Sequence, residues 1–324
     1  MKNRLCAFTA GLMVIGCGTS VAGESAVVYG RADVSFQNES YKYGADQDGN
    51  TFVLKSNASR IGVKGGKELN DNLKAIYQLE WEVSFTDKDT KNGDGDNILK
   101  ARNTYVGITS DYGTLVAGTH DTPLKKAQGK IDLFGDLEGD IKHVLLGENR
   151  VRNVLQYSTP KLMGGLVATL AVVPGEEQEE SAGEVNNGVA DSVSASLIYK
   201  TGDLFASVAV DDSVDGIDTI RISGQYKIEA AKLGVIYQMS ESSAGSAVDD
   251  DGIILSVSYK LGKEVLKFQY GASDMKKKGT EQLSLGVDHK LAKATKLYAF
   301  LTNTTTDSDD DAEMIIAAGI QHKF

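Results

Sequence analysis

The chain has 324 residues, a formal net charge of −11 and a hydrophobic content of 41%. The mean hydropathy of −0.22 excludes a bundle of membrane-spanning helices, and the acidic balance argues against nucleic acid, which requires a basic surface. Thirty-five glycines with only three prolines are typical of strands and turns rather than of a disordered chain.

The chain begins with a segment that has the pattern of a secretory leader. Met1–Arg4 is short and basic, and Leu5–Gly16 is an apolar stretch too short to span a bilayer. Ser20-Val21-Ala22 then offers small residues to signal peptidase. We predict a signal peptide over 1–22, cut after Ala22 or alternatively after Gly23, and a mature domain over 23–324 that is exported through the Sec pathway.

Two other interpretations of this segment remain open at the level of sequence. Val14-Ile15-Gly16-Cys17 resembles a lipoprotein box, and the apolar stretch would also fit a buried helix. Cleavage after Ala22 removes both cysteines, Cys6 and Cys17, and takes the formal charge from −11 to −13 because Lys2 and Arg4 are lost. The mature chain would then have no disulfide to stabilise it.

From Val27 onward the dominant period of the sequence is two. Val28, Val34 and Phe36 alternate with Arg31 and Asp33, and later segments repeat this pattern over about ten residues. One apolar and one polar face is the pattern of a strand between lipid and water. Sixteen such segments can be counted, at 27–37, 51–64, 71–85, 98–109, 113–119, 150–159, 165–173, 190–200, 203–211, 218–228, 231–241, 252–261, 264–273, 280–290, 295–303 and 313–324.

The connections between these segments alternate between short and long. Seven short and eight long connections follow from the segments, as sixteen antiparallel strands require when both termini lie on the short-turn side. The sequence therefore predicts an all-β fold, a 16-stranded antiparallel transmembrane β-barrel. Five aromatic residues on the apolar face, at strand ends of that side, are expected to form a ring at one membrane interface: Tyr157, Tyr199, Tyr226, Tyr259 and Phe324.

Several motifs make a resemblance specific. These are Tyr29-Gly30-Arg31, Ser59 to Gly65 (SRIGVKG), Tyr105-Val106-Gly107, Asn153 to Pro160 (NVLQYSTP) and the terminal Ala318 to Phe324 (AGIQHKF). Over its whole mature length the chain resembles the Gram-negative general diffusion porins. The resemblance implies an outer-membrane, water-filled channel for passive diffusion of ions and small hydrophilic solutes. It also implies a homotrimer in which the second loop, over 86–97, reaches a neighbouring subunit.

The connection from His120 to Asn149 is long for a loop and carries several apolar residues, among them Ile131, Phe134 and Leu145. Folding inward against the wall would bury them, whereas an external loop that touches a partner subunit is the alternative. In porins the third loop folds inward, and Asp132-Leu133-Phe134-Gly135-Asp136 resembles its tip. We therefore expect an inward-folded third loop that narrows the channel.

Strand parity places four arginines on the polar face, opposite the acidic residues of this loop. The resemblance implies a pore constriction made by Arg31, Arg60, Arg102 and Arg152 on the wall and Asp132, Asp136, Glu138 and Asp140 on the loop. Such charges would create a transverse field with weak charge selectivity. The alternative is local pairing within the wall, such as Arg31 with Asp33. Gly118-Thr119-His120 stands where many relatives have Gly-Arg. The absence of that wall arginine would favour the passage of cations.

The remaining candidates concern partners and rival functions. Acidic loops could bind divalent cations that bridge to lipopolysaccharide phosphates, although Asn97 replaces the turn glycine of a calcium loop. An enzyme would need a nucleophile beside one of four histidines, and neither Gly-x-Ser-x-Gly nor His-Glu-x-x-His occurs. No cofactor motif was found. A substrate-specific channel would need inward aromatics, of which Tyr29 is clear and Tyr298 and Phe300 are candidates.

Overall fold

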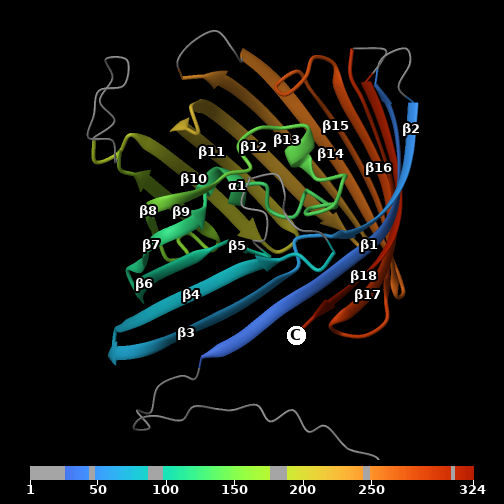
Figure 1. Ribbon diagram of the computed structural model, residues 1–324. Helices are drawn as coiled ribbons and strands as arrows, with labels where there is room; N and C mark the ends of the chain where they lie inside the picture. The colour runs from blue at the N-terminus through green and yellow to red at the C-terminus, as the bar shows by residue number, and fades with distance from the viewer. Residues whose placement is uncertain (1–25, 44–47, 87–97, 176–187, 244–248, 308–310) are drawn as a thin grey trace, which may run out of the picture.

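The computed structural model describes residues 26–43, 48–86, 98–175, 188–243, 249–307 and 311–324. The predicted signal peptide and all but the first residue of the second loop lie outside these ranges. The described residues form one antiparallel sheet whose strands wrap around a central space (Figure 1). The strand segments are β1 (Val27–Tyr43), β2 (Asp48–Ser56), β3 (Arg60–Asn70), β4 (Leu73–Val83), β5 (Leu99–Ala101), β6 (Thr104–Ser110), β7 (Gly113–Asp121), β8 (Arg150–Ser158), β9 (Leu166–Val173), β10 (Ser192–Thr201), β11 (Leu204–Val214), β12 (Ile217–Ile228), β13 (Ala231–Ser242), β14 (Asp249–Leu261), β15 (Glu264–Ser273), β16 (Thr280–Lys290), β17 (Thr295–Thr305) and β18 (Asp311–Lys323).

The eighteen segments make sixteen barrel strands, as predicted. β2 and β3 both pair with β1, and β5 and β6 both pair with β4, so each pair is one strand interrupted by a few residues. The interruption between β2 and β3 lies at Asn57–Ser59, where Ala58 adopts a positive φ of 47°. β1 pairs antiparallel with β18, which closes the barrel and leaves no free sheet edge.

The connections follow the predicted alternation with one correction. The predicted segments 203–211 and 218–228 leave a connection over 212–217, which counts among the eight long ones. In the structure β11 and β12 continue into it, and only Asp215 and Gly216 separate them. Both residues have positive φ, 57° and 73°, which is the Asp-Gly pattern of a tight hairpin turn. The β11–β12 register shifts between Asp211 and Val214, and this bulge absorbs the residues that had suggested a loop.

The barrel is apolar outside and polar inside. On β1, Val28 and Phe36 are 60% and 56% exposed, whereas Asp33 and Gln37 are 2% and 0% exposed. Phe36 stacks on Phe52 of β2 on the outer face, with ring centroids 5.8 Å apart. This pattern is the reverse of that of a water-soluble protein, in which large apolar side chains are buried. It matches strands that face lipid on one side and water on the other.

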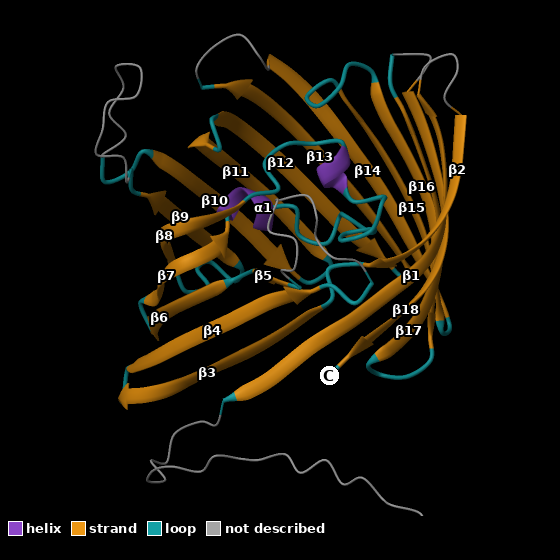
Figure 2. Cartoon of the chain, viewed as in Figure 1, coloured by secondary structure: helices purple, strands orange, loops and turns teal. Residues whose placement is uncertain are grey.

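The β7–β8 connection, over 122–149, is called the third loop below. It contains α1 (Pro123–Lys126) and a 3₁₀ helix (Ile141–His143), the two helices coloured purple in Figure 2. It lies against the inner face of the wall, where Ile131, Val144 and Leu145 pack with Ile236 and Ile254. The largest apolar clusters of the described residues therefore join the loop to the barrel rather than one strand to another.

No helix in the described part of the chain is long and apolar enough to cross a membrane.

Candidate functional site

Local hydrogen bonds fix the shape of the third loop. Thr122 caps α1 by accepting a hydrogen bond from the backbone N–H of Lys125 at 3.1 Å. The Asp140 carboxylate accepts from the backbone N–H of Lys142 and from that of Asp136, both at 2.8 Å. Asp132 accepts from the backbone N–H of Phe134 at 2.9 Å. Asp132 and Asp140 thus bond to the backbone of the loop itself.

Apolar contacts hold the loop tip to β17. The rings of Phe134 and Phe300 meet edge to face with centroids 6.2 Å apart, and Tyr298 and Leu137 belong to the same buried cluster. Burial of Phe134 and its neighbours stabilises the loop position, since a buried Phe contributes about 1.5–3 kcal/mol. The loop therefore covers Phe300, and Tyr298 is buried in the same cluster.

Polar contacts from the wall hold both ends of the loop. Arg221 of β12 is fully buried and donates to Glu148 at 2.7 Å and to the backbone oxygens of Leu146 and Leu124 at 3.0 and 3.4 Å. Gln238 of β13 orients Arg221 by accepting from its Nε at 2.7 Å. No sequence motif marked Arg221, because its partners in the third loop lie more than seventy residues away along the chain.

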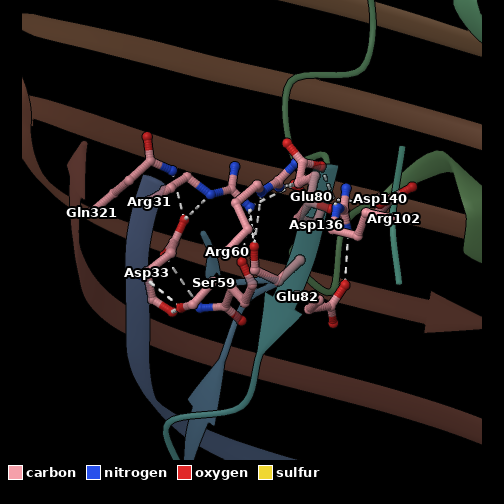
Figure 3. A network of polar contacts seen from close by, with 12 residues as sticks. Arg31, Asp33, Ser59, Arg60, Glu80, Glu82, Arg102, Asp136, Asp140 and Gln321 are labelled. Carbon is pink, nitrogen blue, oxygen red and sulfur yellow. Dashed lines mark hydrogen bonds and ion pairs between the residues drawn. The ribbon is translucent and has the colours of Figure 1, made fainter. Parts of the chain in front are cut away.

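The loop tip meets two of the predicted arginines directly. Arg31 and Arg60 both donate to one carboxylate oxygen of Asp136, at 2.7 and 2.6 Å, as Figure 3 shows. Lys55 of β2 makes a further ion pair with Glu138. The wall of β1–β3 is therefore joined to the loop by ion pairs, and no layer of water separates Arg31 and Arg60 from Asp136.

Arg102 faces the cavity but pairs within the wall. Its guanidinium group donates to Glu80 at 3.0 Å and to Glu82 at 2.6 Å (Figure 3). Tyr29 also donates to Glu80, at 2.9 Å. For Arg102 the local pairing considered in the sequence analysis is therefore what the structure contains. Arg31 is different, because its distance to Asp33 is 3.9 Å and its shorter ion pair is with Asp136.

A cavity of about 560 Å³ lies between the third loop and the part of the wall formed by β2, β4, β5, β7 and β8. Its lining includes four predicted acids, Asp132, Asp136, Glu138 and Asp140, together with Arg102. The charged side chains in the lining that the sequence did not single out are Lys55, Glu82, Lys100, Asp121, Lys125, Lys142, His143, Glu148 and Arg150. Arg31 and Arg60 stand behind this lining and contact Asp136.

Arg150 takes the place in the cavity that strand parity had assigned to Arg152. Arg150 pairs with Asp121 at 2.9 Å and lines the cavity, whereas Arg152 is exposed and is not part of the lining. The β7–β8 register shifts between Gly118 and His120, and Asn153 has a positive φ of 55°. Arg152 and Asn153 are the two β8 residues of this bulge and have no cross-strand partner, so the alternation of faces does not apply to Arg152.

The surroundings push the pKa values of two loop carboxylates apart. Burial opposes ionisation of Asp136, but the guanidinium groups of Arg60, Arg31 and Arg102 lower its pKa to about 2. Burial and the nearby carboxylates of Asp140 and Glu148 raise the pKa of Asp132 well above its ordinary value. At neutral pH Asp136 is therefore a fixed negative charge, and Asp132 binds a proton far more readily.

Among the described residues no group of three or more His, Cys, Asp or Glu side chains is arranged to hold a metal ion. Two histidines lie beside carboxylates, His143 at 3.9 Å from Glu138 and His289 at 2.9 Å from Glu264.

Comparison with known proteins identifies the family. A profile of Gram-negative porins matches residues 7–310. The chain belongs to the Gram-negative porin family. This porin is 28% identical to outer membrane porin protein 32 of Delftia acidovorans over 99% of this chain and 95% of that protein. It is 24% identical to the major outer membrane protein P.IA of Neisseria meningitidis strain H44/76, over 82% of this chain and 81% of that protein.

Solved porin structures share the fold. The anion-selective porin from Comamonas acidovorans superposes with a TM-score of 0.73 at 21% identity, covering 93% of this chain and all of that one. OmpF of Salmonella typhi, solved with daunomycin, gives 0.69 at 14% identity, covering 93% of this chain and 98% of that one. This porin is therefore a diffusion channel of the Gram-negative outer membrane, as the sequence predicted, and its relatives are channels rather than enzymes.

Proposed function

We propose that the third loop forms the constriction of the channel and that the charges around the 560 Å³ cavity set a weak selectivity for ions and small hydrophilic solutes. The observation that carries this proposal is the position of the cavity, which has the loop on one side and strands of the wall on the other. A solute in this space meets charges from the loop and from the wall. Selection then depends on the width of the channel and on these charges rather than on a binding pocket.

Near balance of charge is the reason to expect weak rather than strong selectivity. The cavity lining holds six Lys and Arg side chains against seven Asp and Glu side chains. Several of these neutralise one another, as Arg102 does with Glu82 and Arg150 with Asp121. Burial and the neighbouring carboxylate of Asp140 raise the pKa of Asp132, which favours its neutral form more than an exposed carboxylate would.

Thiol labelling tests whether the loop borders the conducting path. Both cysteines lie within residues 1–22, so the processed chain offers a cysteine-free background. In Gly135→Cys, a quaternary ammonium thiol reagent should lower the single-channel current, because Gly135 lines the cavity. In the control Met163→Cys, a turn residue that is 86% exposed, the current should not change. Equal responses of the two variants would contradict the proposed constriction.

A substrate-specific channel is the second candidate, and the aromatic residues disfavour it. Tyr298 and Phe300 are buried in one cluster with Phe134, so of the three candidates for an inward aromatic ladder only Tyr29 remains beside the polar network. We expect the current to rise in proportion to solute concentration. A saturable current that a second solute can compete with would favour the specific channel instead.

Absence of catalysis is part of the proposal. The purified protein should not turn over esters or peptides while it conducts ions. Measurable hydrolysis that a single histidine substitution abolishes would overturn this assignment.

We propose that the protein is a homotrimer in contact with lipopolysaccharide. A solved relative, OmpT of Vibrio cholerae, is described in a trimer form and shares the fold with a TM-score of 0.63. Native mass spectrometry should show three copies, and a monomer under the same mild conditions would contradict the proposal. Calcium should raise the thermal stability of the protein in lipopolysaccharide if divalent cations bridge the two.

We further propose that residues 1–22 are removed during export. N-terminal sequencing of the membrane-inserted protein should begin at Gly23, or at Glu24 if the cut follows Gly23.

A further inference from the structure

A second charged cavity lies at the opposite end of the wall from the outer loops. It has a volume of about 220 Å³ and lies among the short turns that join β14 to β15 and β16 to β17. Five lysines line it, together with a single carboxylate, that of Asp288: Lys263, Lys290, Lys293, Lys296 and Lys323. This concentration of positive charge contrasts with a chain whose net charge is −11.

The strand register places this cavity on the inner face of the barrel. Lys296 of β17 is the cross-strand partner of Lys290 on one side and of Gln321 on the other. Gln321 in turn lies opposite Asp33 of β1 and donates to it at 2.6 Å. Cross-strand partners project from the same face of a sheet, so Lys290 and Lys296 share the face of Asp33, which is buried inside the barrel. The lysines therefore meet water at the channel mouth rather than lipid.

The acidic side chains near these lysines already form ion pairs or hydrogen bonds with other groups. Asp288 pairs with Lys267 at 3.0 Å and with Lys296 at 2.8 Å. Asp33 accepts from Tyr298 at 2.6 Å in addition to Gln321, and Glu264 pairs with His289 at 2.9 Å. Within the described parts of the chain, four of the five lysines, Lys263, Lys290, Lys293 and Lys323, make no ion pair.

We propose that this cavity binds a small polyvalent anion that carries phosphate or carboxylate groups. The five lysine side chains that line this small space bring several positive charges close together. A multiply charged oxyanion would offset their mutual repulsion and could accept hydrogen bonds from more than one lysine. A monovalent ion of the same size would neutralise only one of them. The site would concentrate such anions at the short-turn mouth of the channel.

Calorimetric titration of the detergent-solubilised protein tests the proposal without any measurement of current. Tripolyphosphate and citrate are the probes, in buffer of low ionic strength because salt screens exposed charges. We expect saturable binding of at least one probe, and the one that binds distinguishes a phosphate site from a carboxylate site. Failure of both probes to bind would overturn the proposal, whatever role the third loop has.

Matched variants assign the binding to this cavity. Lys290→Gln/Lys293→Gln/Lys323→Gln should weaken binding by about tenfold or more, because each lost positive charge removes an attraction to the anion that persists even in water. The control Lys200→Gln/Lys227→Gln/Lys232→Gln removes three exposed lysines from strand ends beside other short turns and should leave binding unchanged. Equal weakening in both triple variants would show only diffuse charge and would overturn the assignment.

The triple variant could fail to fold into a barrel because it changes Lys323 beside the C-terminus, so two further measurements are needed. Lys290→Gln/Lys293→Gln leaves the terminal residues intact and should still lose affinity severalfold. In single-channel recordings, the probe should interrupt the current when added to one chamber and not when added to the other. Interruption from both chambers alike would contradict a site at one mouth.

Discussion

At the scale of single residues, the loop–wall contact depends on a few guanidinium and carboxylate groups with different roles. Asp136 binds the two arginines Arg31 and Arg60, whereas Arg102 is paired with the wall acids Glu80 and Glu82. Removing an arginine therefore has two effects, since it deletes a positive charge and leaves a carboxylate without its partner.

The double variant Arg60→Ala/Arg102→Ala should raise the preference for cations. Asp136 would keep only Arg31, and Glu80 and Glu82 would lose their guanidinium partner. We expect the cation-to-anion permeability ratio to rise by roughly twofold or more, measured as the reversal potential in a salt gradient. The control Lys200→Ala/Lys232→Ala, on short turns, should leave it unchanged. An unchanged reversal potential in the double variant would show that these arginines are not at the constriction.

The ion pair of Asp136 predicts a pH dependence of stability. Its pKa is lowered from 3.8 to about 2 in the folded protein, so its contribution is present above pH 4 and is lost as the pH falls toward 2. This shift corresponds to about 2 kcal/mol.

Thermal unfolding of the wild type and Asp136→Asn should therefore differ most above pH 4 and converge near pH 2. Asp203→Asn is the control, because Asp203 forms an exposed pair with Lys227 at 3.5 Å and should change stability little. A wild-type advantage that stays constant down to pH 2 would contradict the assigned ion pair.

At the scale of elements, the third loop is held by strands on several sides of the barrel. β12 and β13 hold its ends through Arg221 and Gln238, and β17 receives Phe134 at its tip. Arg221 has the largest fully buried side chain, and its ion-pair partner Glu148 belongs to the loop. A buried ion pair that loses one member leaves an uncompensated charge, so this contact is a sensitive point of the loop.

Arg221→Met should destabilise the protein by about 3–5 kcal/mol, because Glu148 would remain buried without its cation. The loss should appear as a lower unfolding temperature and as greater noise in the open-channel current. Arg221→Met/Glu148→Gln should recover much of the stability, whereas the exposed control Lys227→Met should have little effect. If the double variant were as unstable as the single one, the charge pair would not be the reason.

At the scale of the whole molecule, the barrel separates two solvents. Its outer face carries Leu255 and Leu261 of β14, both exposed, and its inner face buries Ser256 on the same strand. Closure through β1 and β18 leaves no strand edge for lipid to meet. The cost of a charge on the outer face should therefore depend on its depth in the bilayer.

Leu255→Arg, in the middle of β14, should cost about 2–4 kcal/mol in folding into lipid vesicles, whereas Leu261→Arg, at the strand end, should cost about 0–1 kcal/mol. The two variants carry the same substitution on the same face, so each controls for the other. Urea-dependent folding in the presence of vesicles measures both. Equal costs would contradict a membrane-spanning β14.

The sequence alone determined the barrel, because alternation of polar and apolar residues is a local property with a fixed period of two. The family resemblance suggested a group of four arginines facing four loop acids across water, but only the tertiary structure showed that Arg31 and Arg60 pair directly with Asp136. The sequence could not determine that Arg150 rather than Arg152 lines the cavity, because Arg152 and Asn153 form a bulge in which the alternation of faces breaks down. Only the tertiary structure brought Arg221 to the loop ends and five lysines to one mouth, because these contacts join residues from strands distant in the chain.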